Sequence, residues 1–145
     1  MVCKNPDQCL QITKKRYDAM EKGMDLVEDK IVQFREKYKN GEGDISFARH
    51  AAVRGLERSF NNKHILEALL NGFVMEYYYE AKSKQYQCLI CYFLKLSPGV
   101  YRPVHIAVQM QSNDHLFVKT VYDPRSNPWK WNENFTNRIC VCKTN

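Results

Sequence analysis

The second half of the chain constrains the fold most, because four consecutive segments there have the composition of β-strands. They cover residues 73–80, 86–95, 103–111 and 115–123, and each is rich in β-branched, aromatic or alternating apolar residues. Short segments with turn-forming residues join them, so consecutive strands are expected to pair with their neighbours. The sequence therefore predicts a four-stranded antiparallel sheet.

The first forty residues form one long helical pattern. Asn5-Pro6 or Asp7 can begin this helix, and Gly41 can end it. Its apolar positions follow one another three and four residues apart: Tyr17, Met20, Met24, Val27, Ile31, Phe34 and Tyr38. Three heptads are enough for a helix that packs on its own domain, and also for a coiled coil with a second copy or another partner. Both interpretations stay open from the sequence.

A glycine-containing linker at residues 40–44 separates this helix from the rest. We expect an N-terminal helical unit, 1–40, and a second unit, 41–145. Two shorter helices are predicted in the second unit, one from Asp44 or Ser46 to about Arg58 and one over 64–70. The expected fold class is α+β, with the long N-terminal helix and the two short helices packed on the four-stranded antiparallel sheet.

Charge and composition limit the partners. The chain of 145 residues has a net charge of +6 and a pI near 9.0, which favours a polyanionic partner such as RNA or an acidic protein. No run of about 20 apolar residues is present, and the N-terminal residues lack an apolar signal core. We therefore expect a cytoplasmic protein without a membrane partner.

The six cysteines are expected to be reduced thiols. Cys88 and Cys91 have the spacing of a zinc motif, but residues three apart on a strand point to opposite faces. Cys140 and Cys142 would share a face, yet two ligands do not make a metal site. The sequence thus predicts no metal and no cofactor.

The hairpin formed by the last two strands decides which side chains face away from the core. Pairing Gln111 with His115 gathers apolar side chains on one face, which we expect to be buried. The residues expected on this buried face are Val104, Ile106, Val108, Met110, Leu116, Val118, Thr120 and Tyr122. The other face carries His105 and Lys119, which we expect to be open to a ligand.

RNA can be cut without a metal, because its 2′-hydroxyl is an internal nucleophile. Histidine can transfer protons near neutral pH, and lysine or arginine can stabilise charge on phosphate oxygens. The catalytic candidates are His105, Lys119, His50 and Arg138, and the RNA-binding candidates are Arg49, Arg54, Arg58, Trp129 and Trp131. A structural His105, a solvated helix face and tryptophans that close the core are the alternatives.

Short motifs in a fixed order resemble those of the bacterial and phage group called domain of unknown function 4258. The motifs are Ser46–His50, Leu69–Glu76, Cys88–Ile90, Pro103–Val108 and Thr120–Pro124, with Trp131, Phe135 and Arg138 behind them. That group is similar to RelE-like ribonucleases of the Barnase–EndoU–colicin–RelE fold. By position, the resemblance assigns the two histidines to His50 and His105 and the terminal arginine to Arg138.

The resemblance implies a metal-independent endoribonuclease, either toxin-like or a phage effector. Its partners would be RNA, including ribosome-bound RNA, and an antitoxin or host protein. RelE-like enzymes usually act through arginines, lysines and a tyrosine, whereas Tyr122 is expected here on the buried face. The alternative is a non-catalytic regulatory or RNA-binding protein that dimerises or binds a partner through its N-terminal helix.

Overall fold

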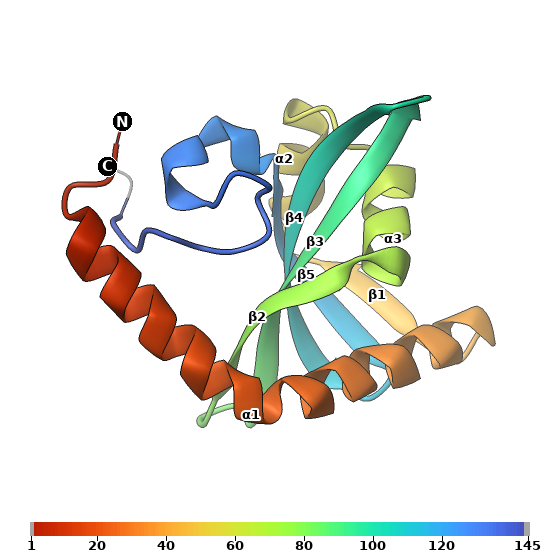
Figure 1. Ribbon diagram of the computed structural model, residues 1–145. Helices are drawn as coiled ribbons and strands as arrows, with labels where there is room; N and C mark the ends of the chain where they lie inside the picture. Colours follow the sequence, from red (N-terminus) through yellow and green to blue (C-terminus); the bar gives the residue numbers. More distant parts are fainter. Residues whose placement is uncertain (1, 144–145) are drawn as a thin grey trace.

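The computed structural model describes residues 2–143 and is organised around one mixed sheet of five strands. The strands are β1 (Asp44–Phe47), β2 (Phe73–Glu80), β3 (Gln85–Ser97), β4 (Val100–Ser112) and β5 (His115–Tyr122). Their order across the sheet is β1-β5-β4-β3-β2, as Figure 1 shows. Strands β2 to β5 pair antiparallel, whereas β1 runs parallel to β5.

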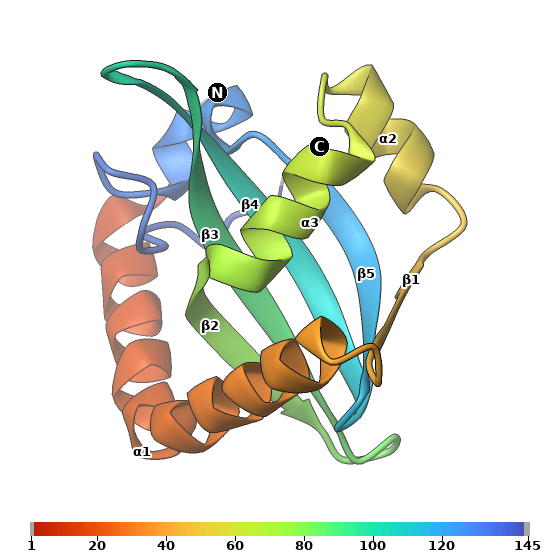
Figure 2. The ribbon, with the colours of Figure 1, turned by 90° about the vertical axis from the view of Figure 1, so that its right-hand side faces the viewer.

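The two faces of the sheet are covered differently. The helices are α1 (Pro6–Lys39), α2 (Ala51–Glu57) and α3 (Asn62–Asn71). Figure 2 shows α2, α3 and the second half of α1 over one face, which we call the helical face. The segment after β5, residues 123–143, lies on the opposite face, which we call the outer face. It includes two short 3-10 turns, Pro124–Ser126 and Pro128–Lys130.

Strand β1 corrects the prediction of four antiparallel strands. Residues 44–47 were expected to begin a helix, but they pair with residues 115–118 of β5. Ile45 and Phe47 pack against the main core, and the Ala48 N–H continues the pairing by donating to the Val118 carbonyl at 2.7 Å. Burial of these side chains on an available sheet edge outweighs local helix signals, so the helix begins only at Ala51.

Helix α1 packs on its own domain, as one of the two interpretations predicted. Val27 and Phe34 are fully buried against the helical face, and Ile31 is almost so. Arg35 donates hydrogen bonds to the Leu69 and Gly72 carbonyls, at 3.0 and 2.6 Å, and so joins α1 to the end of α3. The heptad seam is therefore occupied within the chain.

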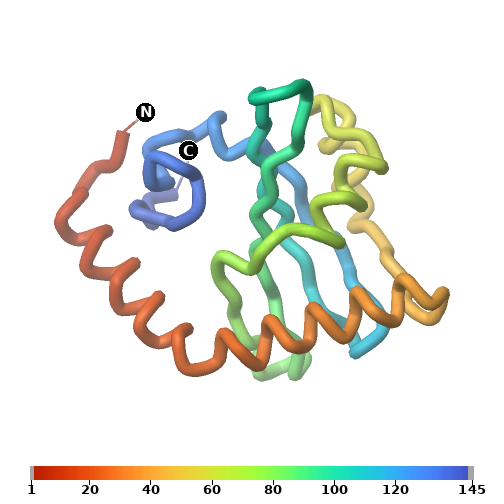
Figure 3. The backbone as a smooth tube through the Cα atoms, turned by 45° about the vertical axis from the view of Figure 1, so that its right-hand side comes forward, coloured from red at the N-terminus to blue at the C-terminus, as the bar shows by residue number. Residues whose placement is uncertain are grey.

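The first half of α1 leaves the sheet and runs toward the end of the chain. Figures 1 and 3 show the helix bending in its middle, so that its N-terminal half stands beside the C-terminal segment. Gly23 lies in this helix, and a Cβ atom there would collide with the Tyr77 hydroxyl. Glycine thus permits close packing between α1 and β2.

A β-bulge in β5 reverses the face of the sheet toward which the side chains after it point. His105 pairs with Tyr122 and Ala107 with Thr120, whereas Val108 pairs with Val118, so Lys119 is the extra residue. After the bulge Val121 faces the main core and Tyr122 faces outward. The prediction that Thr120 and Tyr122 share the buried face is therefore wrong.

A second, smaller hydrophobic cluster lies on the outer face. Its buried members are Met75, Leu89, Cys91 and Trp131, and Phe93, Ala107, Tyr122 and Phe135 pack around them. Trp131 and Phe135 come from the C-terminal segment, so this segment is part of the fold. Among the helices of residues 2–143, none is both long and apolar enough to cross a bilayer.

Candidate functional site

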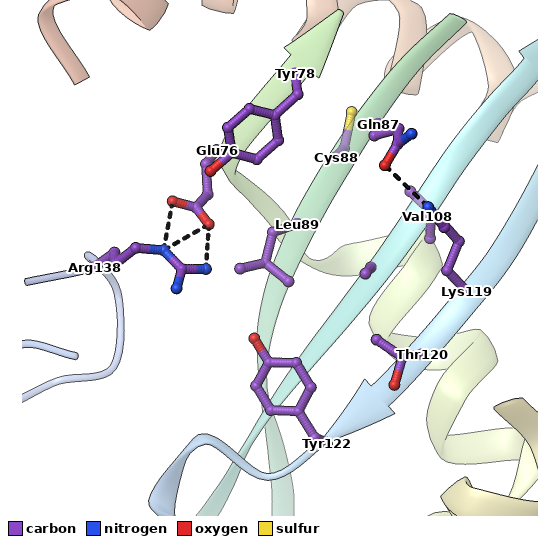
Figure 4. Close-up of a pocket in the computed structure, with 11 residues that line it drawn as sticks. Glu76, Tyr78, Gln87, Cys88, Leu89, Val108, Lys119, Thr120, Tyr122 and Arg138 are labelled. Carbon is purple, nitrogen blue, oxygen red and sulfur yellow. Dashed lines mark hydrogen bonds and ion pairs between the residues drawn. The ribbon is translucent and has the colours of Figure 1, made fainter. Parts of the chain in front are cut away.

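A pocket of about 430 Å³ opens on the outer face, between the strands and the C-terminal segment. Its polar lining side chains are Glu76, Tyr78, Gln87, Lys119, Thr120, Tyr122 and Arg138. Figure 4 shows the Glu76–Arg138 pair on one side of the pocket and Lys119 with Gln87 on the other. Leu89 lies between these two pairs, so the pocket combines an apolar surface with charged walls.

A second pocket of about 350 Å³ adjoins the first. The two share Thr120, Tyr122 and Arg138, and the second adds Arg58 and Lys130. We call the two together the outer groove. Asp123 also lines it, but this carboxylate already pairs with Arg102 at 3.0 Å and with Arg125 at 2.8 Å.

Glu76 and Arg138 form the most buried ion pair of the described residues. Arg138 donates to one carboxylate oxygen from Nη2 at 2.7 Å and from Nε at 3.1 Å. The Glu76 side chain is only 3% exposed, whereas that of Arg138 is 21% exposed. The Arg138 guanidinium also lies over the Trp131 ring, 4.6 Å from its centroid. Burial opposes the guanidinium charge, but the hydrogen bonds and charge of Glu76 outweigh it, so the pKa of Arg138 is raised.

Lys119 supplies a second cation to the pocket, since it follows the core residue Val118 on β5 and points to the outer face. Its side chain is exposed, and its Nζ donates to the Gln87 side-chain oxygen at 3.1 Å. A neutral amide leaves the ammonium charge uncompensated, and two further N–H donors remain available. Lys119 and Arg138 therefore line the same pocket.

His105 faces the outer side, as predicted, but the expectation that its ring is open to a ligand is wrong. The residue is fully buried. Its ring lies edge-on to Trp131 with centroids 4.5 Å apart, and Nε2 is 2.8 Å from the Phe135 carbonyl. The C-terminal segment thus covers the histidine. Burial lowers the pKa of His105 to about 4, although the hydrogen bond to Phe135 partly offsets this effect.

The partners of His105 define its tautomer. The Phe135 carbonyl can only accept, so Nε2 carries the proton, and Nδ1 of the neutral ring has a free lone pair. The Tyr122 hydroxyl lies 3.3 Å from Nδ1 and is the donor to it. Burial raises the pKa of Tyr122, so the phenol stays protonated. The lone pairs of this phenol oxygen remain available to the outer groove.

The other predicted residues are divided between the two sides of the molecule. Arg58 lines the outer groove and donates to the Val121 carbonyl at 2.5 Å. Trp131 is buried and closes the second cluster, which agrees with the alternative interpretation of the tryptophans. The remaining candidates do not line the outer groove: Arg49, His50, Arg54 and Trp129. His50 directly precedes α2 on the helical face, whereas His105 lies under the C-terminal segment on the outer face, so the structure does not bring the two histidines together.

Several residues that line the outer groove were not among the predicted site residues, Glu76, Tyr78 and Tyr122 among them. Glu76 and Tyr78 stand on β2, and Tyr122 was placed on the wrong face. For Tyr122 a signal was present: the apolar alternation of β5 runs through Leu116 and Val118 and then resumes at Val121, out of phase. One extra residue between two apolar runs indicates a bulge.

The cysteines fall into two groups. Cys88 belongs to the main core and Cys91 to the outer cluster, so these two thiols face opposite sides of the sheet, as predicted. The other thiols belong to Cys3, Cys9, Cys140 and Cys142, and all four sulfur atoms lie within 4.8 Å of one another. This group is the only one in the described part of the chain that has the geometry to hold a metal ion.

A family model described as Domain of unknown function (DUF4258) matches residues 47–123, just over half of the chain. The chain belongs to this family. No curated protein and no solved structure matches it. The DUF4258 match contains His105, Lys119 and Tyr122, whereas Arg138 and the four clustered cysteines lie outside it. The outer groove is thus built partly from the DUF4258 domain and partly from the segment that follows it.

Proposed function

We propose that the protein is a metal-independent endoribonuclease of the RelE-like type, which binds and cleaves RNA in the outer groove. The observation that carries the proposal is the convergence of a phenol, an ammonium and a guanidinium on one pocket. These groups belong to Tyr122, Lys119 and Arg138. The set matches the tyrosine, lysine and arginine pattern of RelE-like enzymes better than a pair of histidines does.

The charge of the groove supports an anionic ligand. Arg58, Lys119, Lys130 and Arg138 line it. Asp123 pairs with Arg102 and Arg125, and Glu76 pairs with Arg138. Among the described ion pairs, none engages the other three cations of the groove, Arg58, Lys119 and Lys130. A phosphodiester between Lys119 and Arg138 can accept from the Lys119 ammonium and from Nη1 of Arg138, which makes none of the bonds to Glu76. The net charge of +6 attracts RNA over longer distances.

Cleavage begins when the RNA 2′-oxygen attacks the adjacent phosphorus. A new bond forms between that oxygen and phosphorus, the bond from phosphorus to the 5′-oxygen breaks, and the products carry a 2′,3′-cyclic phosphate and a 5′-hydroxyl. Arg138 stabilises the charge that develops on the non-bridging oxygens. Lys119, the exposed cation, donates a proton to the departing 5′-oxygen.

Tyr122 receives the proton of the 2′-hydroxyl. Its oxygen accepts this proton while its own proton passes to Nδ1 of His105, the acceptor 3.3 Å away. His105 is therefore a positioning residue and proton acceptor behind the phenol and does not touch RNA. Its low pKa makes it a weak base, so the reaction is expected to be slow compared with that of an exposed histidine.

The test uses the full chain and a panel of single-stranded and structured RNAs at low salt, without added divalent ions. We expect cleavage whose rate does not rise with Mg²⁺, and products with 2′,3′-cyclic phosphate ends. Tyr122→Phe and Lys119→Ala should each lower the rate at least tenfold. Induced synthesis in bacteria should slow growth, and Tyr122→Phe should relieve this effect.

Two exposed residues outside the groove provide matched controls: Tyr79→Phe and Lys95→Ala should cleave like the unaltered chain. Cleavage that survives Tyr122→Phe would remove the proposed chemistry. Absence of cleavage with every RNA would remove the enzymatic function altogether.

Plain RNA binding is the second candidate function. The burial of His105 favours it, because the outer groove then lacks an accessible imidazole. Binding without products would establish this alternative. Its affinity should fall steeply with salt, since the groove contacts are with phosphates. Lys119→Ala should reduce that salt dependence, whereas Lys95→Ala should not.

A further inference from the structure

Four thiols from the two ends of the chain meet at one point. Cys3 precedes α1 and Cys9 lies in its first turns, whereas Cys140 and Cys142 end the C-terminal segment. Figures 1 and 3 show these two ends side by side, away from the sheet. Cys9 and Cys140 are buried, at 4% and 0% exposure, and the other two are half-buried.

The spacing of the sulfur atoms is that of a tetrahedral metal site. The Sγ atom of Cys9 lies 3.7 Å from that of Cys140 and 3.7 Å from that of Cys142, and Cys3 lies 3.9 Å from Cys142. A tetrahedron with Zn–S bonds of about 2.3 Å has sulfur–sulfur edges of about 3.8 Å. A disulfide would instead need about 2.0 Å. Each of the four sulfur atoms lies within 4.8 Å of the other three. Two separate pairs of packed thiols would need short distances only within each pair.

We propose that Cys3, Cys9, Cys140 and Cys142 bind one Zn²⁺ ion as a closed four-thiolate site. Soft thiolate ligands in a tetrahedral arrangement select zinc over Mg²⁺ or Ca²⁺. The Cys142 backbone N–H donates to the Cys140 sulfur at 3.4 Å, a contact that stabilises a metal-bound thiolate. Lys4 directly follows Cys3 in the sequence, and Lys143 directly follows Cys142.

Four protein ligands leave no open position for water or substrate, so the zinc is structural. It fastens the N-terminal half of α1 to the C-terminal segment. In the described chain these two parts also meet where the Arg138 N–H donates to the Tyr17 hydroxyl. The site thereby holds the segment that covers His105 and supplies Arg138. It is independent of the proposed RNA chemistry, because zinc binding can be measured without any RNA.

The zinc content of tag-free, full-length protein tests the proposal, measured by elemental analysis and native mass spectrometry after purification under reducing conditions. We expect one zinc ion per chain. Cys3→Ser combined with Cys142→Ser should reduce this to nearly zero, and circular dichroism should show that the sheet persists. Both residues are half-buried, so the variant avoids polar substitutions in the interior. Co²⁺ exchanged into the site should give the visible absorption of a tetrahedral thiolate complex.

Cys88→Ala and Cys91→Ala are the matched controls, since both thiols are buried and face opposite sides of the sheet. Each should retain one zinc ion and the cobalt spectrum. Several outcomes would overturn the proposal: a folded, reduced protein that binds no zinc, zinc retained by the Cys3/Cys142 double variant, or zinc lost equally from Cys88→Ala. Two disulfides in the purified chain, or iron in place of zinc, would also refute it.

Discussion

The Glu76–Arg138 pair allows a quantitative test of how the outer face is built. Arg138→Met removes the cation and leaves the Glu76 carboxylate, 3% exposed, without a counter-charge. Breaking a buried ion pair in this way costs about 3–5 kcal/mol. Glu76→Gln leaves instead the Arg138 guanidinium, whose side chain is 21% exposed and can turn toward the pocket. The expected cost is about 1–3 kcal/mol, the range for lost charged hydrogen bonds.

Urea unfolding of the two single variants and the double variant measures these energies. The double variant should be more stable than the sum of the single costs predicts, with a coupling energy of about 2 kcal/mol. Arg125→Met is the matched control, since Arg125 pairs with Asp123 but is 51% exposed. An exposed pair should contribute less than about 1 kcal/mol.

Two results would refute the reasoning. If Glu76→Gln costs more than Arg138→Met, the carboxylate is not the more deeply buried partner. If the coupling energy is as small as the effect of Arg125→Met, water reaches the Glu76–Arg138 pair and the C-terminal segment does not close the outer face.

Three further predictions concern stability and use the same unfolding assay. Lowering the pH from 7 to 5 should cost about 2 kcal/mol through His105, because its pKa is about 4 in the folded chain and 6.5 in the unfolded one. This contribution of His105 to the free energy of unfolding is present above pH 6.5 and is lost as the pH falls toward 4. His105→Asn should remove the corresponding dependence of stability on pH. The same pH dependence in the variant and the unaltered chain would contradict the burial of His105. Ile31→Ala should cost about 2–5 kcal/mol and Val32→Ala less than about 0.5, because the first is 2% and the second 49% exposed; similar costs would mean that the heptad seam does not pack on the sheet. Gly23→Ala should destabilise the chain, although alanine normally favours a helix over glycine by about 1 kcal/mol, because its Cβ would collide with the Tyr77 hydroxyl. The loss of stability should be smaller in a Tyr77→Phe background. An equal loss in both backgrounds would mean that residues 23 and 77 do not touch.

The local parts of the fold could be predicted because their signals are local. Strand β2 spans residues 73–80 as expected, and the other three predicted strands differ from the observed ones only at their ends. The cap of α1 was also readable: the Asn5 side chain accepts from the Gln8 N–H, and Gly41 adopts a positive φ of 77° after the helix.

The parts that could not be predicted depend on contacts between distant residues. Strand β1 has only four residues, and its partner β5 lies about 70 positions later in the chain. Its local sequence could equally begin a helix, so only the free edge of β5 decides its structure. The zinc-binding geometry was missed for the same reason, since Cys140 and Cys142 gain their partners from the opposite end of the chain.

His105 shows why the face of a residue does not settle its exposure. The strand pattern correctly placed it away from the main core, but pairing rules describe one sheet and not what later covers it. Trp131 and Phe135 of the C-terminal segment supply that cover, and no periodicity in residues 123–143 indicates where they lie. A tail rich in aromatic residues is by itself compatible with ligand binding and with core closure.

The outer groove is lined by residues of the DUF4258 domain and by residues that follow it in the chain. Lys119 and Tyr122 stand on β5 inside the match, whereas Arg138 and the residues that cover His105 come after position 123. A domain reduced to residues 47–123 would keep the phenol and the ammonium but expose His105 and lose the guanidinium. Burial is the main cause of the low pKa of His105, and exposure removes it. In such a domain the imidazole could therefore exchange protons with a ligand directly. In this chain the C-terminal segment covers His105, which is why the proposed mechanism passes the proton through Tyr122.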